Sequence, residues 1–391
     1  MALSKVDLAN QVENQLPQNL VANNLPFRNI IINGDMSIAQ RGTSFASVSD
    51  DDYTLDRFQY DISGTDVYKF TISQDTDVPT GQGFAKSLKL DCTTADATLD
   101  SDNYATIMTK IEGQNLQYLK KGTANAESVT MSFWVKSAKT GTYICELFDV
   151  DNNRVICKSY TIDTANTWEK KTITYAGDTT GAFANSNGGS LRVIFWLLAG
   201  TGFTSGTLAT SWETRNNVDR AVGQVNLGDN TANNFWITGI QLEAGTTASD
   251  FEFLPYDVNL QRCQRYYYKI QPTTNRAFAV GLCYTTNILS MPIDFPTTMR
   301  TAPTALEQNG TASDYQILKA SSLTVCTSVP THQGGTTWGS LVDFNVTGTI
   351  TAGQAGQGWS VNGNAYLAWS AELWFIRYLK RILKVKLFMQ E

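Results

Sequence analysis

The stretch Asn234-Phe235-Trp236-Ile237-Thr238-Gly239-Ile240-Gln241-Leu242-Glu243-Ala244-Gly245 decides the fold of this chain. Apolar and polar side chains alternate along it with a period near two, which is typical of a strand with one buried face. The phase slips at Gly239, and this slip predicts a β-bulge. A second apolar stretch, residues 29–38, predicts another strand with a break at Gly34. We expect these first and last strands of one domain to be neighbours.

Short alternating segments separated by polar turns fill the chain between these two stretches. The clearest of them are residues 67–72, 87–91, 128–136, 143–149, 168–175 and 191–197. Many short strands at this spacing predict a two-sheet sandwich, and a jelly roll fits best. We therefore predict an all-β chain in which residues 27–256 form a jelly-roll β-sandwich.

Four further segments complete the expected organisation. Residues 257–269 lack strand alternation and are expected to be a short helix or a linker. Residues 270–373 show a second β pattern, which predicts a smaller β-sandwich domain. Residues 1–26 place apolar residues at helical spacing before Pro17, which predicts either a short attachment or oligomerisation helix or a frayed end. Residues 374–391 are expected to form a basic amphipathic tail.

This tail mixes bulky apolar residues with basic ones. It could dock onto a neighbouring acidic chain, lie on a membrane surface, or be an incidental extension. We favour docking, because the rest of the chain is acidic. The tail then contributes candidate oligomer-interface residues, namely Trp374, Phe375 and Leu379. Its deletion is expected to weaken an assembly without unfolding residues 27–256.

Composition narrows the class of protein. Charged residues make up 17% of the chain, well below the ~25% typical of soluble domains, and uncharged polar residues replace them. The net charge of −6 does not favour nucleic acid as a partner. Residues 1–25 lack the apolar core of a signal peptide, and no apolar run is long enough to span a membrane.

The six cysteines do not predict a disulfide scaffold or a metal site. None is part of a Cys-x-x-Cys pair, and His332 is the sole histidine, so a zinc site is not expected. We expect free, largely buried thiols, although Cys145 and Cys157 could face each other across a hairpin.

No catalytic motif is recognisable, and we expect no enzyme activity. His332 lies in a loop-like segment, and neither a nucleophile elbow nor a phosphate-binding loop is present. The acidic run Asp50-Asp51-Asp52 could serve a glycosidase or a metal site. A solvated acidic loop is the simpler interpretation.

Aromatic residues are the usual platforms for sugar rings. Four tryptophans lie inside strand patterns and are expected to be core residues: Trp134, Trp168, Trp196 and Trp236. Three others lie in loop-like sequence and are candidate glycan-binding residues, although packing under a loop is an alternative for each: Trp212, Trp338 and Trp359.

Two motifs and the sequence that follows them carry a family resemblance. The frame runs from "NIIINGDMSIAQRGT" at residues 29–43 to "FWITGIQLEAG" at residues 235–245. It is followed by Leu254-Pro255-Tyr256 and then by "LQRCQRYY" at residues 260–267. This pattern resembles the carbohydrate-binding-like jelly roll of bacteriophage tail-fibre and receptor-binding proteins. The tail after Leu373 departs from the pattern.

The resemblance implies a non-enzymatic virion protein that attaches to host-surface glycans. It implies a parallel homotrimer that contacts other tail or capsid proteins and is assembled in the host cytoplasm. Tyr266, Tyr267 and Tyr268 become candidate oligomer-interface residues. Modules of this kind often hold one structural calcium, for which Asp35 and Glu243 are the candidate ligands; no other cofactor is expected.

Two other functions are compatible with the sequence. The chain could be a capsid fibre, neck or adaptor protein whose jelly roll is purely structural. It could also be a surface-polysaccharide depolymerase, since glycosidases need only carboxylates.

Overall fold

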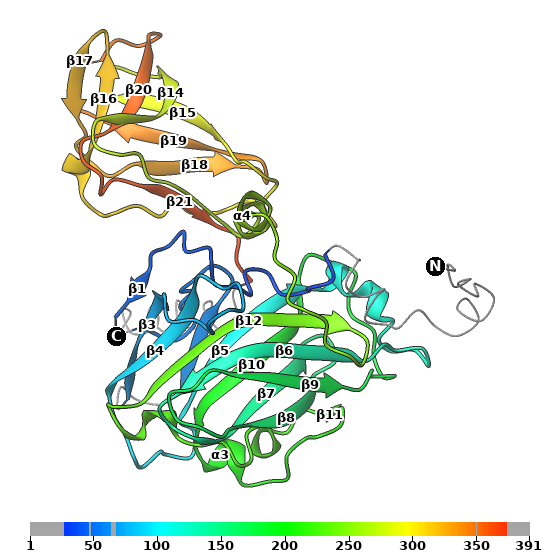
Figure 1. The fold of residues 1–391 in the computed structure, drawn as a ribbon. Coiled ribbons are helices and arrows are strands. Elements are labelled where there is room, and N and C mark those ends of the chain that lie inside the picture. Colours follow the sequence, from blue (N-terminus) through cyan, green and yellow to red (C-terminus); the bar gives the residue numbers. More distant parts are fainter. Residues whose placement is uncertain (1–26, 47, 64–67, 349, 374–391) are drawn as a thin grey trace, which may run out of the picture. The chain divides into compact units, whose positions relative to one another are not determined.

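The computed structural model describes residues 27–373 except residues 47, 64–67 and 349 (Figure 1). The expected N-terminal helix and the C-terminal tail, with Trp374, Phe375 and Leu379, lie outside the described residues. Contacts divide the chain into two compact units, one ending at Leu254 and one beginning at Pro255. The all-β prediction is confirmed, because both units consist mainly of antiparallel sheets with few, short helices.

The first unit is a sandwich of two six-stranded sheets. Sheet A has the strand order β1 (Ser44–Phe45), β3 (Lys69–Asp75), β4 (Ser87–Thr94), β12 (Asn234–Ala244), β6 (Val129–Ser137) and β9 (Glu169–Tyr175). Sheet B has the order β11 (Glu213–Thr214), β8 (Arg154–Ile162), β7 (Gly141–Asp149), β10 (Gly189–Ala199), β5 (Tyr104–Glu112) and β2 (Gln59–Ser63).

Short helical turns connect these strands. They are η1 (Gly113–Asn115), η2 (Gln117–Leu119), α3 (Thr201–Thr204), η3 (Asn217–Asp219) and η4 (Leu227–Asp229). The main core lies between the two sheets, where alternate residues such as Phe133, Phe195 and Phe235 are fully buried. Sheet B is covered on its other side as well, because a second cluster joins Ile194 and Trp196 to Phe203 of α3.

The end strands meet as predicted, although only one of them is a regular strand. β12 contains the predicted bulge: its register against β6 shifts between Thr238 and Gln241, and Gly239 has a φ of +62°. A Cβ at Gly239 would lie 2.5 Å from the Phe84 ring, so both the backbone angle and the space favour glycine.

Residues 29–38 do not form the predicted strand. They run beside β12 irregularly, with Ile30 N–H donating to the Leu242 carbonyl at 2.9 Å and Ile240 N–H donating to the Gly34 carbonyl at 2.9 Å. Asn33 and Met36 have positive φ angles, which break the extended conformation that regular pairing needs. The Asn33 side chain instead accepts from Ile38 N–H and donates to the Ile38 carbonyl.

The second unit begins with α4 (Tyr256–Gln264), and β13 (Tyr267–Ile270) then pairs with β21 (Leu367–Ser370). Its main sheet has seven strands, in the order β17 (Ser322–Val325), β16 (Tyr315–Lys319), β20 (Ala355–Ser360), β14 (Arg276–Cys283), β15 (Ile288–Asp294), β19 (Gly339–Asn345) and β18 (Thr331–Gly335). A short turn, η5 (Ala312–Asp314), precedes β16. The core of this unit includes Met291, Tyr315 and Phe344 from the main sheet and Trp369 from β21.

All six cysteines lie in the described part of the chain, buried and without a disulfide. Cys145 and Cys157 do not face each other across the β7–β8 hairpin, because Cys145 is opposite Lys158 and Cys157 is opposite Glu146. Burial raises the pKa of the Cys145 thiol to about 12, which keeps it protonated and unreactive at neutral pH. In the part of the chain that the structure describes, no helix is long and apolar enough to cross a membrane.

Candidate functional site

The face of sheet A that points away from the core is the candidate site. The register places Trp236 opposite Lys136 of β6 and Lys89 of β4, and it places Trp134 opposite Thr238 of β12 and Lys170 of β9. These residues alternate with buried neighbours such as Phe235 and Ile237, so they lie on the outer side of the sheet.

The return segment after β12 covers one end of this outer face. The hydroxyl of Thr130 donates to the Gly245 carbonyl at 2.8 Å, and the Gln241 side chain donates to Ser249 Oγ at 3.1 Å. At the other end of the face, Trp134 and Trp168 are half-buried and Trp236 is buried. We call this end the tryptophan face and define it by Trp134, Trp168, Trp236, Lys136 and Asp77.

Trp168 and Trp236 are fixed through their indole nitrogens. Trp168 Nε1–H donates to Asp77 Oδ1 at 2.9 Å, and Trp236 Nε1–H donates to Asp75 Oδ2 at 3.1 Å. Lys136 forms an ion pair with Asp77, and its ammonium lies 4.2 Å from the centroid of the Trp236 ring and 5.5 Å from that of Trp168. This one lysine therefore links two tryptophans by cation–π contacts.

The charged side chains of the tryptophan face lie beside side chains of the opposite charge. Burial alone would raise the pKa of Asp75, but hydrogen bonds from Trp236 and from the backbone of Asp77 and Thr76 outweigh it and lower that pKa. Asp75 therefore stays ionised near neutral pH and can accept hydrogen bonds. Lys89 completes the group, since its ammonium lies 5.4 Å from the Trp236 ring centroid.

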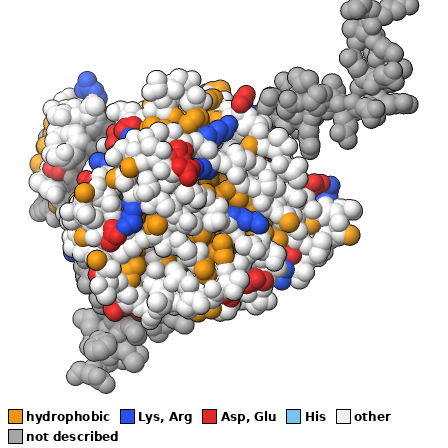
Figure 2. Space-filling model, turned by 60° about the horizontal axis from the view of Figure 1, so that its bottom comes forward, with side chains coloured by type: hydrophobic (Ala, Val, Ile, Leu, Met, Phe, Trp, Pro, Cys, Tyr) orange, Lys and Arg blue, Asp and Glu red, His pale blue; other side chains and the backbone are white. Residues whose placement is uncertain are grey.

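This arrangement suits an uncharged polyhydroxylated ligand. Indole rings provide flat apolar surface, and Thr172 of β9 adds an exposed hydroxyl on the same side. The ammonium groups can donate hydrogen bonds to ligand hydroxyls, and the carboxylates can accept hydrogen bonds from them. Figure 2 shows one view of the surface, on which charged side chains are sparse and red and blue groups often adjoin.

Two of the four predicted core tryptophans differ from that expectation, because Trp134 and Trp168 are half-buried. Trp196 and Trp236 are buried as predicted, although Trp236 lies on the outer side of its strand. Apolar residues surround Trp236 in sequence, which obscured its phase. The signal that could have revealed it is the alternation of Phe235 and Ile237, which places Trp236 between two core-facing positions.

The loop tryptophans proposed for glycan binding are divided between the chain's two units. In the first unit, Trp212 is half-buried, and its indole donates to the Ala176 carbonyl at 2.7 Å. In the second unit, Trp359 is half-buried on β20, whereas Trp338 is 66% exposed beside β19. Tyr266 and Tyr267 are buried inside the second unit, and Tyr268 stacks on Trp369 at 6.0 Å, so these side chains already have partners within their own unit.

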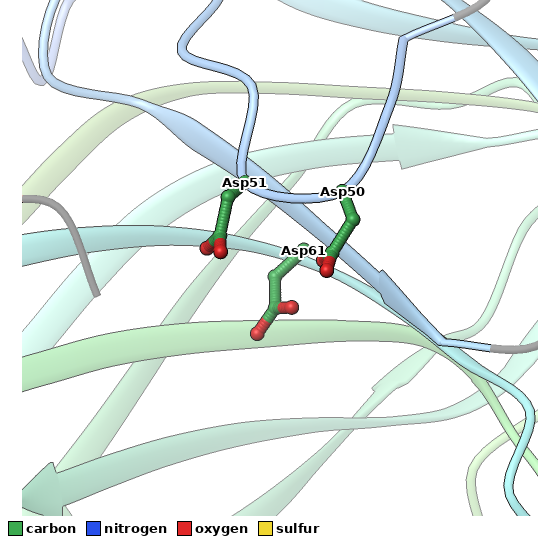
Figure 3. A group of neighbouring side chains, drawn as sticks. All are labelled: Asp50, Asp51 and Asp61. Atoms are coloured by element: carbon green, nitrogen blue, oxygen red, sulfur yellow. The ribbon is translucent and has the colours of Figure 1, made fainter. Parts of the chain in front are cut away.

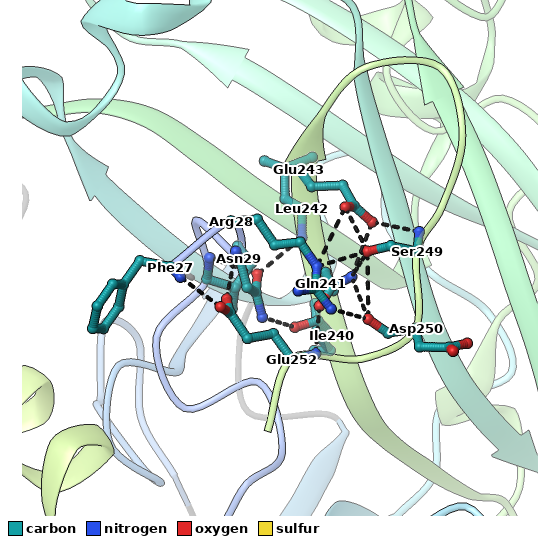
Figure 4. Close-up of polar contacts among 11 residues, drawn as sticks. Phe27, Arg28, Asn29, Ile240, Gln241, Leu242, Glu243, Ser249, Asp250 and Glu252 are labelled. Atoms are coloured by element: carbon teal, nitrogen blue, oxygen red, sulfur yellow. Dashed lines mark hydrogen bonds and ion pairs between the residues drawn. The ribbon is translucent and has the colours of Figure 1, made fainter. Parts of the chain in front are cut away.

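The two calcium candidates have protein partners. Glu243 is buried, and its carboxylate accepts hydrogen bonds from Ser249 N–H, Ser249 Oγ–H and Gln241 Nε2–H at 2.7–2.9 Å (Figure 4). Arg28 adds a positive charge 3.8 Å away. Asp35 accepts from the Ser37 hydroxyl at 3.0 Å. The Glu243 carboxylate is thus already hydrogen-bonded and paired with a positive charge.

The same network closes the domain. Glu252 accepts from the N–H groups of Phe27 and Asn29 at 2.5 and 2.9 Å, and Asn29 exchanges hydrogen bonds with Ile240 and Leu242 of β12 (Figure 4). Residues at the two ends of the unit are thus joined by side chains where regular strand pairing is missing.

A second polar cluster joins Asp50 and Asp51 to Asp61 of β2, with their carboxylate oxygens within 4.8 Å of one another (Figure 3). Asp50 accepts from Ile62 N–H at 3.2 Å, and Asp61 accepts from the Tyr104 hydroxyl at 3.0 Å. Burial and a hydrogen bond to Asp61 raise the pKa of Asp50 to about 7. The cluster can share a proton, and its oxygens are of the kind that divalent cations prefer. Asp52, the third residue of the acidic run, instead caps Ser49 N–H at 2.7 Å.

We expect the substitution Asp50→Asn to stabilise the first unit at pH 8 but not at pH 4. A raised pKa in the folded state means that the stability present below about pH 4 is lost as the pH rises through 7. The gain at pH 8 should be roughly 1–2 kcal/mol, less than the full pKa displacement implies, because the group is partly solvated. Urea unfolding at both pH values measures this, with Asp52→Asn as the matched control. An equal effect of Asp50→Asn at both pH values would contradict it.

Comparisons with known proteins bear on the fold alone. No family model matches the sequence, and no curated protein matches it. Similar solved structures include the enzymatically active domain of tailspike protein 4 of bacteriophage CBA120, with 14% identity, a TM-score of 0.31, and coverage of 56% of this chain and 22% of that one. The matched part thus spans about a fifth of the tailspike chain.

Carbohydrate-binding modules are also among the similar structures. A CBM4 module has 12% identity and a TM-score of 0.28, covering 54% of this chain and 97% of that one. The family 11 module of a cellulosomal cellulase of Clostridium thermocellum has 11% identity and a TM-score of 0.26, covering 52% and 97%. This chain is therefore similar in structure, at low sequence identity, to carbohydrate-binding-module β-sandwiches and to a phage tailspike domain.

Proposed function

We propose that this chain is a non-enzymatic virion fibre or spike protein, a homotrimer that binds host-surface glycan through the tryptophan face of its first unit. The observation that carries the proposal is the outer side of sheet A, where indole rings fixed by Asp75 and Asp77 lie among paired charges and an exposed hydroxyl. Such a face offers stacking surface and hydrogen-bonding groups together, which is what a sugar ring requires.

One feature of the molecule supports a binding role over hydrolysis. Asp50 and Asp61 are hydrogen-bonded to each other, whereas glycosidase carboxylates stand at least about 5 Å apart with the scissile bond between them. A reducing-sugar assay on host polysaccharide should therefore show no release of product.

The test is a glycan array that includes bacterial surface polysaccharides, followed by titration of the best ligand. We expect Trp168→Ala and Trp134→Ala each to weaken binding at least tenfold, because truncating an aromatic contact at a binding centre costs about 2 kcal/mol. Trp338→Ala, which removes an exposed tryptophan from the other unit, is the matched control and should leave binding unchanged.

The control also discriminates between binding faces. Loss of binding in Trp338→Ala alone would move the site to the second unit. If the protein binds no glycan on the array, the alternative is favoured in which the sandwich is a purely structural part of a capsid fibre, neck or adaptor.

A further inference from the structure

One side of the seven-stranded sheet in the second unit is apolar and exposed. Large apolar side chains with 41–58% of their surface exposed lie on three of its strands; they are Val280 and Leu282 of β14, Leu323 and Val325 of β17, and Leu341 of β19. We call this side the apolar outer face. Tyr284, just after β14, is 73% exposed.

The register places these residues on a single side. Leu323 is opposite Leu318, which is opposite Gln357, which is opposite Val280, so one row crosses four strands. A second row joins Val325 through Gln316 to Trp359. Because residues directly opposite each other point to the same side of a sheet, all of these side chains lie away from the core formed by Ile317, Met291 and Phe344.

Charge is nearly absent from the middle of the apolar outer face. Asp343 of β19 lies on this side, but it is 9% exposed and accepts a hydrogen bond from Ser290. Asp294 follows at the exposed end of β15. In a closed trimer every copy turns this same face toward its neighbours, and a face with so few exposed charges can be buried there without strong repulsion, although the chain as a whole carries −6.

The dimensions of the sheet also suit self-association. Seven strands spaced ~4.8 Å apart, with about six residues rising ~3.3 Å each, span roughly 29 by 20 Å. Two such faces would together bury on the order of 1,100 Å², which reaches the lower range of specific interfaces. Sheets pack face to face in this way inside ordinary sandwiches.

We propose that the apolar outer face is the surface through which copies of this chain associate. Alternate side chains of β14, β17 and β19 then become buried between neighbouring copies. The inference deepens the homotrimer part of the proposed function and is independent of glycan binding.

The test measures the mass of the full chain by light scattering at micromolar concentration. We expect three times the chain mass for the natural sequence, and the single-chain mass for the double variant Leu282→Asp, Leu323→Asp. The matched control, Thr172→Asp with Thr174→Asp, adds the same charge at exposed strand positions of sheet A and should keep the natural mass.

Each outcome decides the proposal. A natural chain of single mass overturns it together with the homotrimer. If the double variant keeps the oligomer mass of the natural chain, the apolar outer face is not the interface, but the homotrimer remains supported. If aspartate unfolds the second unit, as circular dichroism would show, Leu282→Thr with Leu323→Thr takes its place and should raise the dissociation constant at least tenfold; an unchanged constant refutes the face. If removing residues 374–391 alone reduces the mass to that of a single chain, the tail mediates association, and this result also refutes the apolar outer face as the interface.

Discussion

A fragment ending at residue 220 is expected not to fold, whereas a fragment of residues 27–254 is expected to fold cooperatively. The missing β12 lies in the middle of sheet A, between β4 and β6. It buries Phe235, Ile237, Ile240 and Leu242 almost completely, each contributing about 1.5–3 kcal/mol. The sum is comparable to the ~5–15 kcal/mol by which a whole domain is stable.

Thermal unfolding followed by circular dichroism tests this expectation, with the 27–254 fragment as the control. Without β12, the inner edges of β4 and β6 would also be left unpaired, which favours aggregation. A soluble 27–220 fragment with a cooperative transition would show that sheet A does not depend on its closing strand.

The substitution Arg220→Met is expected to destabilise the first unit by about 3–5 kcal/mol, because it leaves a buried carboxylate without its partner. Glu146 of β7 is 0% exposed, and Arg220 is 8% exposed. Arg220 Nη2 lies 2.9 Å from Glu146 Oε1, and Trp196 Nε1–H donates to Glu146 Oε2 at 2.8 Å. The guanidinium also lies 5.0 Å from the centroid of the Trp196 ring.

The double variant Glu146→Gln, Arg220→Met is the control, since it removes the buried charge together with its partner. It should recover part of the loss, and urea unfolding of both variants measures the difference. An Arg220→Met protein within about 0.5 kcal/mol of the natural chain would mean that water reaches Glu146.

The strand pattern was predictable because alternation reflects burial directly. β12 and its bulge at Gly239 follow from the sequence, since a phase slip at a glycine has few other structural solutions. The strand expected over residues 29–38 fails because Asn33 and Met36 adopt positive φ, and the Asn33 side chain replaces backbone partners. When side chains take the place of the backbone hydrogen bonds between two strands, the sequence shows no periodic pattern.

The candidate site was harder to predict than the fold. Trp134 and Trp236 belong to strands whose neighbours are also apolar, so their phase was ambiguous until cross-strand pairing placed them opposite Thr238 and Lys136. The acidic run was visible in the sequence, but its third member is Asp61 rather than Asp52. Asp61 joins because β2 passes beside the loop that carries Asp50.

The sequence by itself determined that this protein is all-β, where its strands lie, and that β12 carries a bulge, because periodicity and glycine act within a few residues. Tertiary structure alone decided which side chains from different strands lie side by side on one sheet face. That choice depends on pairings between strands as far apart as β4 and β12, which bring Lys89 beside Trp236. The tryptophan face and the apolar outer face are both consequences of such long-range pairing, and no local pattern encodes them.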